Sequence, residues 1–156
     1  MSNHEVIMVK SLTEPLEFKL PNSCRVVELT PQRIKQWGVL QKSADEFNDI
    51  TETLFEEEFG NDFTIQKERT ILLYESDKLV GAITAWFGGH GYEDSMGRLH
   101  WLAVSPSSQG KGYGKLLVNL CLDRLYKLGH REVYLTTSTV RPIAIALYQK
   151  FGLTTI

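Results

Sequence analysis

Hydrophobic residues along this chain fall into short runs of strand length and into longer stretches with helical spacing. The short runs, rich in branched and aromatic side chains, predict strands over residues 24–29, 70–76, 79–87, 98–104 and 133–137. Apolar residues that recur every three or four positions predict three helices. They span residues 31–44, the stretch that follows Gly114 and ends at residue 128, and residues 141–151. This order of elements predicts a mixed α/β domain.

The chain divides into an expected N-terminal arm, residues 1–23, and a single domain, residues 24–156. Within the arm, residues 16–20 alternate between apolar and charged side chains and predict a short strand. Pro15 and Pro21 bracket this segment, which favours a position at a sheet edge.

Local residues predict where several elements begin and end. Thr30 is suited to cap the first helix, with Pro31 at its first position, and Gly129 is suited to end the central helix. Asp77 and Lys78 separate two strand-like runs and predict a hairpin.

Two further segments carry less regular patterns. Residues 88–97 begin with clustered glycines and are expected to form a flexible loop. Residues 43–62 are acidic and contain no Lys or Arg, which indicates either a solvated face or a wall that attracts a cation. Apolar residues in this block predict an inward-facing helical stripe of Phe47, Ile50, Leu54 and Phe55.

Composition narrows the classes of function. A net charge of -2 and a pI of about 6.1 leave no basic footprint for nucleic acid or an anionic membrane. We expect no membrane span and no secretory leader, and with only Cys24 and Cys121 we expect a reduced, cytoplasmic protein. The four histidines are scattered without ligand spacing, so no metal site is expected.

A glycine-rich turn, Gln109-Gly-Lys-Gly-Tyr-Gly114, follows the apolar run 101–104 and precedes the central helix. The first N–H groups of a helix lack internal partners, and glycines let the backbone approach an anion closely. Strand, glycine turn and helix therefore predict a phosphate-binding site, although the glycines can also serve only to relieve crowding. The spacing matches neither the nucleotide-hydrolase loop nor the dinucleotide fingerprint.

The turn resembles the Q/R-x-x-G-x-G/A motif of the GNAT superfamily, with Gln109, Gly112 and Gly114 at the defining positions. Residues 144–153 resemble the second hallmark of that family, A-x-x-L-Y-x-x-x-G-F, and the resemblance spans residues 24–153. It implies a mostly antiparallel sheet with one splayed parallel strand pair and flanking helices. It also implies that the turn amides hold the pyrophosphate of acetyl-CoA, a role that falls on Gln109, Gly110, Lys111, Gly112, Tyr113, Gly114 and Lys115.

Further site residues follow from the same resemblance. The backbone of Leu102, Ala103 and Val104 would meet the pantetheine arm and the acetyl carbonyl, with one N–H acting as an oxyanion donor. Tyr148 would lie beside the coenzyme sulfur as an acid, unless it is only a core tyrosine. Arg141 stands where many relatives carry an asparagine that contacts the pantetheine arm, so its role as a cofactor contact departs from the pattern.

The general base is less well determined. His100 has a suitable reference pKa and lies two residues before Leu102 on a strand, although a structural histidine fits equally well. Arg98 stands where some relatives carry a carboxylate. Glu58 and Glu93 are weaker candidates.

Taken together, the resemblance implies an acetyl-CoA-dependent N-acetyltransferase that transfers acetyl to a primary amine by direct attack in a ternary complex. The acceptor is a small cationic amine or a peptide amine. The alternatives are a CoA-binding sensor without turnover and an interaction module with a vestigial turn. Since relatives continue into a further strand where this sequence stops at Ile156, an exposed edge also favours a homodimer.

Overall fold

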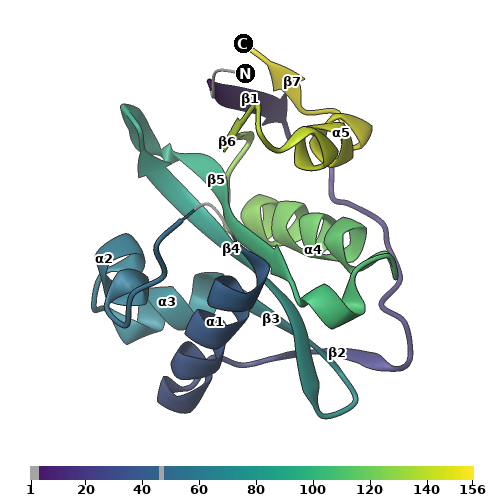
Figure 1. Cartoon of the computed structure of the whole chain (residues 1–156). Helices are drawn as coiled ribbons and strands as arrows, with labels where there is room; N and C mark the ends of the chain where they lie inside the picture. The colour runs from purple at the N-terminus through teal and green to yellow at the C-terminus, as the bar shows by residue number, and fades with distance from the viewer. Residues whose placement is uncertain (1–3, 46–47) are drawn as a thin grey trace.

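The computed structural model describes residues 4–45 and 48–156, and its centre is a seven-stranded sheet (Figure 1). The strand order is β2-β3-β4-β5-β6-β1-β7. The strands are β1 (Glu5–Ser11), β2 (Cys24–Val27), β3 (Thr70–Glu75), β4 (Lys78–Gly89), β5 (Tyr92–Val104), β6 (Glu132–Ser138) and β7 (Thr154–Thr155). The helices are α1 (Pro31–Ala44), α2 (Leu54–Phe59), α3 (Phe63–Arg69), a short 3₁₀ turn (Pro106–Ser108), α4 (Tyr113–Lys127) and α5 (Pro142–Lys150).

Neighbouring strands are antiparallel except for one pair. β5 and β6 run parallel, and their register covers only Gly97 opposite Val133 and Arg98 opposite Tyr134. β5 continues to Val104 without β6 beside it, so the two strands diverge. This confirms the predicted mixed α/β class, with a mostly antiparallel sheet and one splayed parallel pair.

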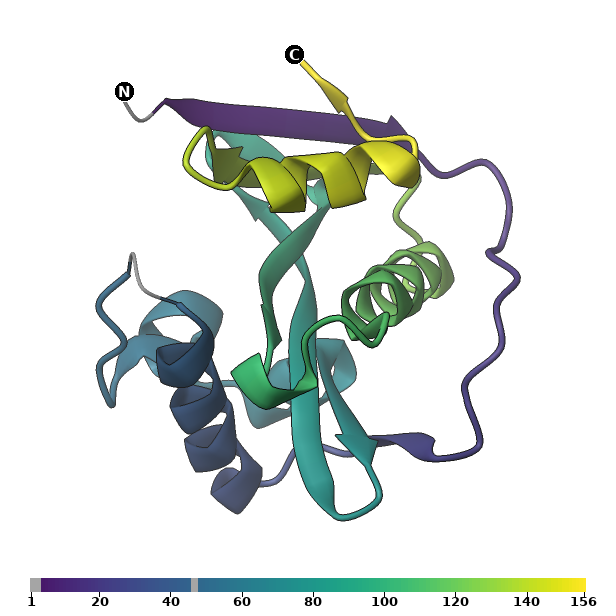
Figure 2. The ribbon, with the colours of Figure 1, turned by 45° about the vertical axis from the view of Figure 1, so that its right-hand side comes forward.

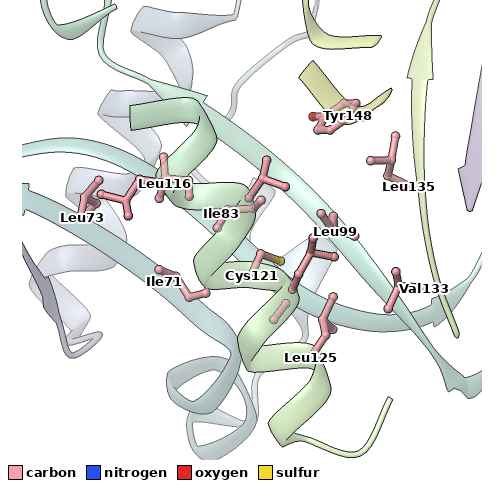
Figure 3. Packing of buried hydrophobic residues seen from close by; sticks show 14 of the residues in the cluster. Ile71, Leu73, Ile83, Leu99, Leu116, Cys121, Leu125, Val133, Leu135 and Tyr148 are labelled. Atoms are coloured by element: carbon pink, nitrogen blue, oxygen red, sulfur yellow. The ribbon is translucent and has the colours of Figure 1, made fainter. Parts of the chain in front are cut away.

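Helices cover both faces of the sheet. Figure 2 shows α1 and α2 on one side and α4 on the other. The core beneath α4 contains Leu117, Cys121 and Leu125, all fully buried and spaced one turn apart. Figure 3 shows Cys121 and Leu125 on this face of α4. Burying each such leucine contributes roughly 1.5–3 kcal/mol, so this stripe fixes α4 against the sheet. The opposite core is built around Trp37, which meets the rings of Phe55 and Phe59 edge-on.

The predicted helix ends are confirmed. Thr30 accepts a hydrogen bond from the Arg33 backbone N–H (3.2 Å), and Pro31 occupies the first position of α1. Gly129 follows α4 with φ of 96°, a conformation that favours glycine.

Within residues 1–23, the strand forms at other positions than predicted. Glu5–Ser11 is a strand, β1, which pairs with β6 along its whole length and buries Met8 completely. Residues 16–20, predicted as a strand, instead lie outside the sheet in a stretch without regular structure. Pro15 and Pro21 lack N–H donors for a ladder, which agrees with this outcome.

The prediction of a flexible, glycine-rich loop over residues 88–97 was also wrong. β4 and β5 continue as a hairpin to Gly89 opposite Tyr92, with His90 and Gly91 in the turn. Tyr92 stacks on Tyr134 with ring centroids 4.3 Å apart, and the Tyr134 hydroxyl donates to the Gly88 carbonyl. These contacts hold a segment whose sequence suggested mobility. The other hairpin turns at Ser76 and Asp77, one residue earlier than predicted.

The acidic block, residues 43–62, contains the short helix α2, and α3 begins directly after it. Asp62 caps α3 by accepting from the Thr64 N–H (3.0 Å), which explains one acidic side chain of the block. Phe55 is buried as predicted, whereas Glu46 and Phe47 lie outside the described residues. Ile143, an apolar residue in the first turn of α5, is 86% exposed.

Among the described residues, no helix combines the length and the apolar composition that crossing a membrane requires.

Candidate active site

A cleft of about 390 Å³ opens where β5 and β6 diverge. Such a volume lies within the usual range for sites that hold small ligands. The end of α1 and the start of α5 border it, and Leu99 and Leu135 from the core lie at its base. Its remaining lining residues are Asp45, Asn48, Ile83, His100, Trp101, Leu102, Thr136, Thr137, Ser138, Val140, Arg141, Ala144 and Tyr148.

A β-bulge in β5 shapes one wall of this cleft. Ala82 pairs with Ala103 and Thr84 with His100, so β5 carries one extra residue between these pairs. Trp101 lies in the bulge with φ of 55°, a left-handed conformation that is unusual for a bulky residue.

Backbone donors beyond the bulge face the opening. The Ser105 N–H donates to the Val80 carbonyl on β4 (2.8 Å). Because N–H groups alternate between the two edges of a regular strand, that of Val104 points away from β4, toward the side that β6 has left. Leu102 is one of the two bulge residues, where this alternation is interrupted. Ala103 is buried, pairs with β4 and does not line the cleft, unlike Leu102.

Tyr148 enters the cleft from α5. Its side chain is 9% exposed and packs on the core that contains Cys121 (Figure 3). Burial, with a smaller contribution from Cys121, raises the pKa of the phenol to about 12, against an opposing effect of Arg141. The phenol therefore keeps its proton throughout the neutral pH range.

His100 lines the same cleft and is flanked by aromatic rings. The centroids of Phe59 and Trp101 lie 5.9 and 5.8 Å from its imidazole. Burial, and then the charge of Arg98, lower the pKa of His100 to about 3. The imidazole is neutral at pH 7, and it is too weakly basic to take a proton readily from an ammonium ion.

Arg141 joins the two helices that border the cleft. Its guanidinium, at the N-terminus of α5, lies 3.1 Å from the Asp45 carboxylate at the end of α1. The Asp45 side chain is 9% exposed, so this ion pair is screened less than a surface pair. It closes one side of the opening.

The glycine turn presents a row of free donors. In the part of the chain that the structure describes, the backbone N–H groups of residues 109–115 donate to no protein acceptor. The first bond of the helical ladder runs from Leu116 to Gly112 (3.2 Å). Gly110 and Gly112 have φ of 82° and 84°, and a Cβ added at either would meet no protein atom within 4 Å. The turn is an open backbone concavity that suits an anion.

The turn is also joined to the helix of Tyr148. A Cβ at Gly114 would lie 3.4 Å from Leu147 Cδ2, so α4 and α5 approach closely at this glycine. The side chains of Gln109, Lys111 and Lys115 are exposed and lie outside the cleft lining. Tyr113, by contrast, is buried in the core.

The structure thus brings His100 and Leu102 from β5 to one cleft with Tyr148 from α5 and Arg141 from the N-cap of α5. Glu58 contacts this region indirectly, by accepting from Trp101 Nε1 (3.1 Å). Glu93 is exposed near the hairpin turn and does not line the cleft.

Sequence analysis missed the polar residues on β6 that line the cleft, Thr136, Thr137 and Ser138. The change from apolar to hydroxyl side chains after Leu135 was the available indication. No group of three His, Cys, Asp or Glu side chains suited to a metal occurs among residues 4–45 and 48–156.

Together these features form a cleft between two diverging parallel strands, with a turn of free amides beside a cleft-lining tyrosine. Residues 34–153 match the acetyltransferase (GNAT) family. The chain therefore belongs to the GNAT family of acetyltransferases.

Individual relatives are similar over part of their length. Mycothiol acetyltransferase of Geodermatophilus obscurus is 31% identical over 85 residues, which are 53% of this chain and 28% of the relative. The chain thus matches little more than a quarter of the length of that relative.

Solved structures agree on the fold. A GCN5-related N-acetyltransferase from Sphaerobacter thermophilus superposes with a TM-score of 0.72 at 19% identity, over 99% of this chain and 48% of the other. Arabidopsis thaliana Naa50, in complex with the bisubstrate analogue CoA-Ac-MVNAL, has a TM-score of 0.66 at 26% identity. That match covers 83% of this chain and 82% of Naa50.

Proposed function

We propose that this protein transfers an acetyl group from acetyl-CoA to a primary amine by direct attack of the amine on the thioester. The observation that carries the proposal is the divergence of β5 from β6, because it joins free backbone donors and a buried tyrosine in one cleft. Acetyl-CoA supplies the acetyl group as a reactive thioester, together with the phosphates that the glycine turn would hold.

The residues that would hold acetyl-CoA form a continuous path. The amides of residues 109–115 would bind its pyrophosphate, with Lys111 and Lys115 adding positive charge. The backbone of β5 from Leu102 to Val104 would meet the pantetheine arm, and the Leu102 N–H would stabilise negative charge on the carbonyl oxygen. Arg141 borders the cleft, and because its guanidinium pairs with Asp45, its main role would be to form the cleft wall rather than to contact the cofactor.

Tyr148 would serve the leaving group. As the amine nitrogen bonds to the carbonyl carbon and the C–S bond breaks, negative charge develops on sulfur. A protonated phenol donates a hydrogen bond to that sulfur, and a proton that it passes on is replaced by one that the nitrogen loses. The products are an amide and a free thiol.

No described residue in the cleft is a strong candidate for the base. His100 has too low a pKa to act efficiently, so we assign it a neutral, hydrogen-bonding role. Glu58 is engaged with Trp101, and Glu93 is remote. We therefore infer that the amine loses its proton to water or binds in its neutral form.

The acceptor is proposed to be cationic in solution. The segment between α1 and α2 borders the cleft through Asp45, which pairs with Arg141, and through Asn48. It belongs to an acidic block, residues 43–62, that contains no Lys or Arg of its own. Such a field raises the local concentration of cations at the cleft.

Calorimetric titration with acetyl-CoA and with CoA, followed by thiol release with polyamines and N-terminal peptides, tests this proposal. Micromolar binding and amine-dependent thiol release are the expected results. Binding without release for any amine would favour a CoA-binding module, and a folded protein that binds neither ligand would refute the site.

A further inference from the structure

One side chain of α1 forms a hydrogen bond to the bulge in β5 from outside the sheet. Gln41 is 1% exposed, and its Nε2 donates to the backbone carbonyl of Trp101 (3.0 Å). This carbonyl belongs to the residue with the left-handed backbone at the cleft wall. A conformation of this kind persists only where its surroundings hold it.

The hydrogen bond has a consequence on the other side of the peptide. The carbonyl of Trp101 and the N–H of Leu102 belong to the same planar unit, and no peptide bond among the described residues is cis. In a trans unit the two groups point in opposite directions. Fixing the carbonyl toward α1 therefore aims the Leu102 N–H away from α1, and Leu102 lines the cleft.

We propose that Gln41 is a positioning residue for acetyl transfer: it orients the Trp101–Leu102 peptide so that the Leu102 N–H meets the thioester carbonyl oxygen. The inference rests on the proposed function. Donation to the carbonyl also polarises the peptide unit, which strengthens its N–H as a donor. Gln41 touches neither the ligand nor the reacting atoms.

Other contacts hold the side chain of Trp101, whereas the hydrogen bond from Gln41 acts on its backbone carbonyl. Its indole N–H donates to Glu58, and its ring meets Trp37 edge-on with centroids 6.0 Å apart. These contacts locate the side chain but leave rotation of the following peptide to be fixed by Gln41.

The experiment compares Gln41→Met with Gln66→Met. Methionine is similar in size to glutamine but cannot donate. Gln66 is a matched control, because it is 6% exposed and its Nε2 also donates to a backbone carbonyl, that of Gly60, away from the cleft. Gln41→Asn keeps an amide, but its side chain is one methylene shorter and cannot reach the Trp101 carbonyl. This variant takes the place of Gln41→Met if Gln41→Met does not fold.

Three readouts separate positioning from a merely structural role. In Gln41→Met we expect kcat to fall by about tenfold or more, toward the roughly 10²–10³-fold loss on removing an oxyanion donor, with KM for acetyl-CoA within about twofold. The infrared band of bound acetyl-CoA labelled with ¹³C at the carbonyl should move to higher frequency than in the wild type. Gln66→Met should lower the melting temperature comparably and leave both readouts unchanged.

An unchanged carbonyl band with a kcat like that of Gln66→Met would overturn the role of Gln41, while wild-type binding and turnover would still support the proposed function. A wild-type protein that does not bind acetyl-CoA would overturn both.

Discussion

Replacing Gly112 with glutamate places a negative charge at the mouth of the glycine turn. The ideal Cβ at this position meets no protein atom within 4 Å, so the side chain has room to enter the concavity. At about 6 Å and an effective dielectric constant of about 40, each pair of unit charges costs roughly 1.4 kcal/mol. The two charges of a pyrophosphate give about 2.8 kcal/mol, so Kd for CoA should rise about 100-fold.

Gly129→Glu is the matched control. Gly129 lies at the opposite end of α4, has φ of 96° against 84° for Gly112, and is equally open. Both substitutions add one charge and similar backbone strain, about 1–2 kcal/mol. The helix dipole favours an anion at the N-terminus by about 0.3–1 kcal/mol and disfavours it at the C-terminus, so Gly112→Glu should melt at the higher temperature.

The assay is calorimetric titration of both variants with CoA at about 0.15 M salt, with melting curves alongside. We expect the more stable variant, Gly112→Glu, to be the one that loses affinity, which loss of folding cannot explain. Equal affinities in the two variants would refute a phosphate site at this turn.

Three other predictions concern the cleft and the core. Tyr148→Phe should lower kcat by about tenfold to 100-fold and leave the calorimetric Kd for CoA within about twofold, whereas an equal kcat would remove the phenol from the chemistry. The unfolded state takes up the His100 proton near pH 6.5 and the folded state only near pH 3, so stability falls as pH drops through this window. Denaturant titrations at pH 7 and 5 should show that His100→Gln removes up to about 1.4 kcal/mol per pH unit of this loss, and parallel curves would contradict the lowered pKa. Burial raises the pKa of the Cys121 thiol and keeps it protonated, so Cys121→Ala should turn over at the wild-type rate. The variant should lose about 1 kcal/mol of unfolding free energy. If mass spectra showed acetylated protein after incubation with acetyl-CoA and no acceptor, direct transfer would be contradicted.

Features that depend on neighbouring residues could be predicted from the sequence. The Thr30 cap, the Gly129 stop and the buried stripe of α4 each require only a few adjacent positions, and the structure confirms them. The open glycine turn at the head of α4 is local in the same sense, because the glycines that allow its conformation belong to the turn itself.

β1 and the hairpin between β4 and β5 depend on partners far away in the chain. β1 is a strand because β6, more than a hundred residues later, offers a free edge along its whole length. The glycines around His90 suggested mobility, but Tyr134 holds the segment by stacking on Tyr92 and bonding to Gly88. The periodicity of residues within β1 or within the hairpin gives no information about these distant partners, β6 and Tyr134.

The candidate site divides in the same way. Tyr148 and the turn could be selected from motifs, but the grip of Gln41 on Trp101 joins residues 60 positions apart and has no local pattern. The lowered pKa of His100 likewise arises from burial in the folded chain and from Arg98, and the reference value of an isolated imidazole contains neither cause.

The two titratable groups that line the cleft and have shifted pKa values are moved in opposite directions, and this bears on how the amine reacts. His100 stays neutral above about pH 3, and Tyr148 stays protonated up to about pH 12. Neither group changes charge while an alkyl ammonium, with a pKa near 10.4, gives up its proton. In the proposed reaction the site would therefore stabilise charge through fixed donors, the Leu102 N–H at the carbonyl and the Tyr148 hydroxyl at the sulfur. The supply of neutral amine would be left to the acceptor and to water. In such a site the rise of kcat/KM with pH belongs to the acceptor, because the protein contributes orientation and hydrogen bonds whose strength is constant across that range.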